Sequence, residues 1–149
     1  MKYLIFIAII LTQNLFAADK VYQKLDRVEF FDLSFVLPEK SILKEESQNY
    51  KKIIPYESDN WLLIIRKIEL NNKDLDLNFL IKSGFTQDIK KEAENKKIST
   101  YKRDKLINGN SVRIIFYHLQ INDNHYTAWL TYKKDIRELE EHFRSFLIE

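Results

Sequence analysis

The chain has 149 residues, a formal net charge of +2 at pH 7 and no cysteine. The missing cysteines exclude a disulfide framework, a thiol nucleophile, a zinc–thiolate site and a lipid anchor attached through cysteine. Basic and acidic residues are interspersed, and even the densest basic cluster, Lys90, Lys91, Lys96 and Lys97, is interrupted by Glu92 and Glu94, which argues against nucleic-acid binding.

Residues 1–17 have the pattern of a secretory signal peptide. Lys2 precedes an apolar run over 3–11, and Leu15-Phe16-Ala17 before Ala18 forms a small-residue cleavage site. The run is shorter than the about 20 apolar residues of a membrane span, and no later run reaches that length. We expect one domain over 18–149 with no membrane span after cleavage. The composition, rich in lysine, isoleucine and asparagine, is typical of a bacterial protein and favours the periplasm.

Strand patterns fill the first half of this domain, although residues 18–27 give no prediction. Residues 28–37 predict one strand that ends at Pro38, with Phe31 and Leu33 on the same side. Weak alternation over 42–57 predicts a hairpin that turns near 47–49. Residues 61–70 carry apolar side chains on both faces, which indicates a central strand.

The apolar period changes to about 3.6 after 71–74, and this change predicts a helical segment. Leu75, Phe79 and Leu80 form its stripe, with Asp74 or Asp76 as the N-cap. Ser83-Gly84 interrupts the pattern, and Thr86 is positioned to cap a continuation through Ile89 and Ala93. The pattern fits one bent helix or two short ones.

The last third predicts a three-strand antiparallel meander and a closing helix. Asn108-Gly109 is the dipeptide of a type I′ hairpin turn, and it places Asp104 opposite Arg113. A second turn over 122–124 leads into a strand at 125–133. Residues 135–147 have the capping box and apolar stripe of an amphipathic helix that packs on the sheet. The predicted fold class is therefore α+β: an antiparallel β-sheet flanked by a middle helical segment and a C-terminal amphipathic helix.

This layout resembles the PsbP-like fold, which includes bacterial envelope proteins of the DcrB type. The resembling pieces are Leu33 to Pro38, the strong strand followed by a helix, Ile107-Asn108-Gly109 and Phe143 to Phe146. The resemblance spans about 28–149. It implies a non-catalytic accessory or binding role and brings no catalytic residue to this chain.

Four residues are candidates for binding contacts. Arg66 falls on an apolar face of its strand, where it needs a carboxylate, a route to solvent for its head group, or an anionic ligand. His118, His125 and Trp129 share one face of the predicted last hairpin, and a two-residue loop at 123–124 pairs His118 with Trp129 and separates the imidazoles. Two histidines rarely hold a metal without a third ligand, so we predict surface histidines and no metal site.

A fifth residue, His142, is predicted to pair with Glu138 on the closing helix. The aromatic-rich meander is predicted to be packing surface or a docking surface for a protein. No phosphate loop, nucleophile elbow or zinc motif occurs in the chain.

The leading hypothesis is a non-catalytic exported protein of the bacterial envelope that acts by protein–protein binding and needs no cofactor. One alternative is an immunity protein against a toxin delivered to the periplasm. A second is a small-ligand binder or enzyme that uses a cleft between sheet and helices, with Arg66 or the histidines as polar contacts.

Overall fold

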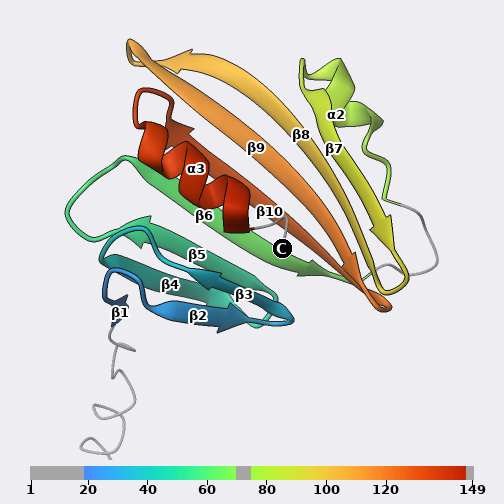
Figure 1. Ribbon diagram of the computed structural model, residues 1–149, viewed down its shortest axis with the longest axis horizontal. Helices are drawn as coiled ribbons and strands as arrows, with labels where there is room; N and C mark the ends of the chain where they lie inside the picture. Colours follow the sequence, from blue (N-terminus) through green and yellow to red (C-terminus); the bar gives the residue numbers. More distant parts are fainter. Residues whose placement is uncertain (1–18, 70–74, 147–149) are drawn as a thin grey trace, which may run out of the picture.

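The computed structural model describes residues 19–69 and 75–146. Most of these residues belong to one antiparallel sheet of eight strands in the order β1-β4-β5-β6-β10-β9-β8-β7. Two meanders, β4-β5-β6 and β7-β8-β9-β10, are joined where β6 pairs with β10 (Figure 1). The elements are β1 (Lys20–Tyr22), β2 (Arg27–Phe30), β3 (Leu33–Val36), β4 (Ser41–Ser47), β5 (Tyr50–Pro55), β6 (Trp61–Ile68), α2 (Asn78–Lys82), β7 (Thr86–Ala93), β8 (Lys96–Ile107), β9 (Asn110–Ile121), β10 (Asn124–Lys133) and α3 (Arg137–Phe146).

One side of this sheet, which we call the inner face, is covered by the β2–β3 hairpin and α3. Alternate residues of each strand point to this face, so that Trp61, Leu63 and Ile65 of β6 are all buried. Phe143 of α3 meets Trp61 edge-on, with the ring centroids 5.4 Å apart. The main core of the protein lies between these two layers.

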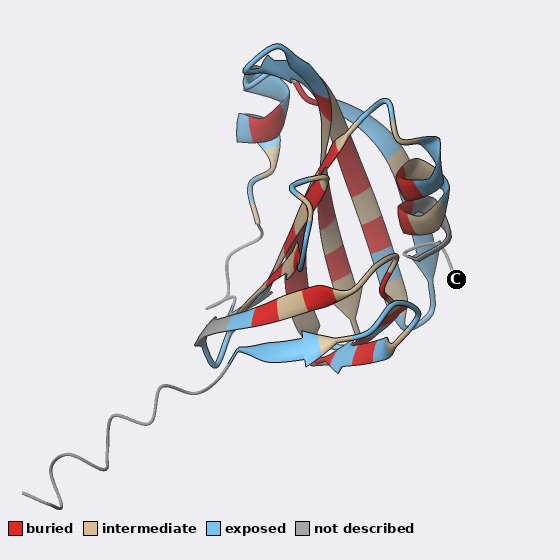
Figure 2. Cartoon of the chain, turned by 90° about the vertical axis from the view of Figure 1, so that its left-hand side faces the viewer, coloured by how far each residue is buried: buried red, intermediate tan, exposed pale blue. Residues whose placement is uncertain are grey.

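The opposite side, which we call the open face, is covered by described residues only at one end. There α2 and the residues after it pack Leu80 and Phe85 against Tyr101 and Phe116 of the sheet. Figure 2 shows α2 and α3 on opposite sides of the strands, where buried and half-buried residues alternate. Away from α2, the alternate residues of β5 and β6 on this face, such as Leu62 and Ile64, are half-buried.

The prediction of an α+β fold is wrong, because strands account for 61% of the structure and helices for 10%. The predicted middle helix is five residues long at Asn78–Lys82, and its expected continuation is strand β7. In β7 only Ile89 is even half-buried, so the edge strand lacks the alternation that identifies strands. Pairing with β8 overrides the helix propensity of its lysines, glutamate and alanine. The closing helix forms, but it is short, at ten residues.

The single strand predicted for 28–37 is also wrong, because the chain reverses at Phe31-Asp32 and forms the β2–β3 hairpin. Phe31 adopts a φ of +57°, which local sequence rules do not predict for an aromatic residue. Its ring stacks on Tyr126, and the Tyr126 hydroxyl donates a hydrogen bond to Asp32. Contacts with β10 therefore hold a turn that its own sequence does not specify.

Several strand predictions are confirmed. The hairpin predicted within 42–57 is β4–β5, and β6 lies between β5 and β10, in the middle of the sheet. The β8–β9 turn has positive φ at both Asn108 (49°) and Gly109 (80°), as a type I′ turn requires. Asp104 faces Arg113 in the predicted register.

Candidate functional site

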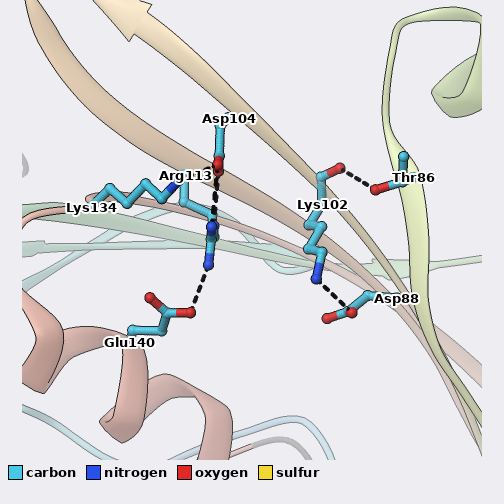
Figure 3. A network of polar contacts seen from close by, with 7 residues as sticks. All are labelled: Thr86, Asp88, Lys102, Asp104, Arg113, Lys134 and Glu140. Carbon is cyan, nitrogen blue, oxygen red and sulfur yellow. Dashed lines mark hydrogen bonds and ion pairs between the residues drawn. The ribbon is translucent and has the colours of Figure 1, made fainter.

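The space between α3 and the sheet is nearly filled. Its cavity measures 40 Å³, far below the about 300 Å³ of a small ligand-binding pocket. The ionisable groups around it pair with one another (Figure 3): Arg113 Nη1 donates to Glu140 at 2.6 Å, and Lys102 Nζ lies 2.7 Å from Asp88. The cavity between the sheet and α3 is therefore too small for a substrate, whereas a separate hollow of 350 Å³ lies between α3 and the segment at Pro38 and Glu39.

Arg113 also neutralises Asp104, at the outer end of the same network. Its Nε lies 2.8 Å from Asp104 Oδ1, and Lys134 Nζ lies 2.5 Å from Oδ2. The hydrogen bond from Arg113 and the charge of Lys134 hold the pKa of Asp104 well below its usual range. These groups have partners within the protein, so this network joins α3 to the sheet and does not receive a ligand.

The open face, in contrast, brings all four predicted site residues together. Arg66 of β6 faces Thr127 of β10, and Thr127 faces His118 of β9. His125 and Trp129 flank Thr127 on either side along β10, on the same face. Since neighbouring strands lie about 4.8 Å apart, the Arg66 and His118 backbones are about 10 Å apart.

The predicted register of the last hairpin is wrong by one loop position. The loop is Asn122-Asp123, so His118 faces Thr127 and not Trp129. This register makes His118 and His125 diagonal neighbours, with Nε2 of His118 3.2 Å from Nδ1 of His125 and the rings stacked. Burial, and then the neighbouring His125, lower the pKa of His118. The two imidazoles thus form a hydrogen-bonded pair.

Arg66 is exposed, and its guanidinium lies 4.8 Å from the centre of the Tyr50 ring. No carboxylate among the described residues forms an ion pair with it. A cation–π contact orients the guanidinium plane without using its N–H donors. Within the described residues, these donors therefore remain available to a ligand.

His142 lies on the other side of the molecule. Its Nε2 is 2.5 Å from the carbonyl oxygen of Val36, which it contacts across the layer between α3 and the β2–β3 hairpin. The expected pairing with Glu138 stays a prediction.

A hollow of 470 Å³ opens on the open face beside the β8–β9 turn. Ile54, Leu62 and Val112 supply its apolar floor, and Lys52 and Lys133 lie at its margin. Lys133 pairs with Asp59 at 2.5 Å, whereas Lys52 forms no ion pair within the described residues. The hollow is therefore apolar at its base and basic at its rim.

The strands gather basic side chains on the open face. Pairing and alternation place eight there: Lys44, Lys52, Arg66, Lys90, Lys97, Arg103, Lys105 and Lys133. Described acids pair with three of these bases: Glu92 with Lys90 at 3.4 Å, Asp19 with Lys44 at 3.9 Å, and Asp59 with Lys133 at 2.5 Å. The same strand pairing places seven bases on the inner face of the strands: Lys20, Lys51, Lys67, Lys91, Lys96, Lys102 and Arg113. The layer that covers the inner face carries more acids, at Asp26, Glu29, Asp32, Glu39, Asp135, Glu138, Glu140 and Glu141, than bases, at Lys24, Arg27, Lys40, Lys134 and Arg137.

Sequence reasoning missed the basic open face because it read charges along the chain, where the two signs alternate. The feature that reveals this face is the side of its strand on which each charged residue lies. Lys52, Arg66 and Lys133 all lie on the same side as half-buried aliphatic residues. The alternation within each strand predicts a surface patch only when the strand boundaries and registers are known.

Within residues 19–69 and 75–146, no three histidine, cysteine, aspartate or glutamate side chains gather closely enough to hold a metal ion. No helix in the described part of the chain is long and apolar enough to cross a membrane. The signal peptide predicted over 1–17 lies outside the described residues.

Comparisons of the chain with protein-family models, curated proteins and solved structures found no match. The resemblance to the PsbP-like fold therefore stays a prediction.

Proposed function

We propose that this chain is an exported, non-catalytic envelope protein that binds an acidic surface of another protein with its open face. The observation that carries the proposal is the gathering of basic side chains around an apolar floor on that face. Export rests on the sequence pattern of residues 1–17.

The chemistry of the face favours a protein partner. Half-buried Ile54, Leu62 and Ile64 supply apolar area of the kind that forms the centre of a protein interface. Lys52, with no ion-pair partner among the described residues, would attract an acidic surface and accelerate association. A nucleic acid would use the lysines and arginines but not the aliphatic floor. We therefore favour a partner that presents both carboxylates and apolar side chains.

The immunity hypothesis is a special case of this proposal, since a toxin would be one such partner. The enzyme hypothesis has less support, because the cavity between sheet and α3 measures 40 Å³ and the charges that line it are paired.

The test is affinity capture from envelope extract with charge-reversed variants. Lys52→Glu/Lys105→Glu reverses two lysines of the open face, and Lys24→Glu/Arg137→Glu reverses two exposed bases on the opposite side. Circular dichroism establishes that both variants fold. We expect a partner with an acidic surface that is retained by the control pair and lost by the open-face pair.

The proposal fails if both variants capture the same proteins as the wild type, or if the control pair alone loses the partner. It also fails if nuclease treatment abolishes capture and the open face binds single- or double-stranded DNA directly, because the partner would then be a nucleic acid.

A further inference from the structure

Arg66, Thr127, His118 and His125 form a compact polar cluster on the open face. Thr127 lies between Arg66 and His118 in the lateral row across β6, β10 and β9, and its side chain is 5% exposed. The long Arg66 side chain and the two imidazoles rise on either side of it. Thr127 is therefore covered by its neighbours, with a cation in the row on one side and an imidazole on the other.

The guanidinium offers a planar pair of donors. Tyr50 stacks on Arg66 at 4.8 Å and no described carboxylate pairs with it, so the donor edge is free to bind an anion in a bidentate manner. Arg113 shows the contrast on the inner face, because its donors are taken by Asp104 and Glu140.

The histidine pair offers one further donor whatever its tautomer. If His118 Nε2 donates across the 3.2 Å contact, His125 keeps an N–H on Nε2; if His125 Nδ1 donates, His118 keeps one on Nδ1. A proton added to the pair makes both outer nitrogens donors and adds a positive charge. The cluster therefore binds anions better when the pair is protonated.

We propose that Arg66, Thr127, His118 and His125 form a carboxylate-binding site that receives an aspartate or glutamate side chain of the docked partner. This inference rests on the proposed function, and it names the part of the open face that recognises the partner's charge. The carboxylate accepts two hydrogen bonds from Arg66 and one from the histidine pair, and it lies above Thr127.

The site predicts tighter binding at lower pH. Burial and His125 lower the pKa of His118 in the free protein, and a bound carboxylate stabilises the imidazolium and raises that pKa again. Binding therefore takes up protons, and affinity increases as pH falls from 7.5 to 5.5. The described charged groups that face the pair are Arg66 and Glu69 from the β6 side, Lys97 on β8, and Lys90 with Glu92 on β7.

The experiment is an NMR titration of the full chain with glutarate, observed at the imidazole signals of its three histidines. His142 is the internal control, because it contacts Val36 on the other side of the sheet. Glutaramide, which is neutral, and sodium chloride at matched ionic strength separate carboxylate binding from non-specific effects. We expect saturable shifts of His118 and His125 with glutarate alone, and a lower dissociation constant at pH 5.5 than at pH 7.5.

Arginine variants give the decisive comparison. Arg66→Gln should weaken glutarate binding by about tenfold or more, Arg66→Lys should weaken it less, and the matched control Arg137→Gln on α3 should leave it unchanged. Equal shifts of all three histidines, equal effects of glutaramide, or unchanged binding in Arg66→Gln would overturn the site.

The same experiments separate this inference from the proposed function. If partner capture depends on the open-face lysines but glutarate does not bind, the carboxylate site is wrong and the docking proposal stands. If glutarate binds at Arg66 but reversal of Lys52 and Lys105 leaves capture unchanged, the docking proposal is wrong and the cluster is a site for small carboxylates.

Discussion

Leu62 and Leu63 are adjacent in β6 but point to opposite faces of the sheet. The same change, leucine to alanine, at each position therefore compares how much each face contributes to stability. Leu63 is 1% exposed in the core, whereas Leu62 is half-buried on the open face. Leu63→Ala removes buried methyl and methylene groups and leaves a cavity, and it should lower the free energy of unfolding by about 3.5 kcal/mol. Leu62→Ala loses about half of the transfer energy and leaves no closed cavity, so we expect about 1 kcal/mol.

Urea denaturation followed by tryptophan fluorescence measures both effects, because Trp61 is buried at the core. At about 4 °C per kcal/mol for a domain of this size, the melting temperature should fall by about 14 °C in Leu63→Ala and about 4 °C in Leu62→Ala. For partner binding the order should reverse: Leu62→Ala weakens it at a temperature where both variants are folded, and Leu63→Ala does not. Equal destabilisation by the two substitutions would refute the reasoning, because Leu62 would then be covered in the free protein.

Four further outcomes follow from the structure. Asp104→Asn should lower the free energy of unfolding by about 1 kcal/mol at pH 7, a value discounted for the 41% exposure of this side chain. Because the pKa of Asp104 is lower in the folded than in the unfolded protein, urea denaturation should show this difference from the wild type being lost as pH falls below about 4. Burial raises the pKa of Tyr117, so stability should be lost as pH rises above about 10, and urea denaturation should show a smaller loss in Tyr117→Phe. Gly109→Ala should cost about 1 kcal/mol in urea denaturation through its φ of +80° alone, because nothing lies within 4 Å of the added Cβ; a neutral result would exclude backbone strain at this turn. N-terminal sequencing of protein from the bacterial envelope should begin near Ala18, and an intact Met1 would contradict export.

The sequence predicts those parts of the fold in which local and tertiary preferences agree. Trp61–Ile68 is apolar on both faces and forms a central strand, and Asn108-Gly109 sets both the turn and the register of β8 and β9. In both places the residues that define the local structure also pack in the sheet, so pattern and structure coincide.

The incorrect predictions occur where tertiary contacts override local preference. The β7 strand exposes nearly all of its side chains and has a helix-favouring composition, so only pairing with β8 makes it a strand. The reversal at Phe31-Asp32 is held by contacts of both residues with Tyr126, which is far away in the sequence. Neither can be derived from a local window.

The candidate site was likewise predicted only in part. Strand alternation was sufficient to place Arg66 among aliphatic residues and to put His118, His125 and Trp129 on one face. It did not bring the two histidines into contact, because a shift of the loop to Asn122-Asp123 changes every pair in the hairpin. The basic open face could not be predicted for a related reason, because its lysines come from strands that are far apart in the chain.

Lysine acetylation tests the docking face most directly. Mass spectrometry would quantify acetylation of the protein alone and in complex with its captured partner. Lys52, Lys97 and Lys105 lie on the open face, while Lys24, Lys40 and Lys134 lie on the opposite side. We predict that the partner slows acetylation of the first three lysines and leaves the second three unchanged. Protection of Lys24, Lys40 and Lys134 with unaltered open-face lysines would contradict the account.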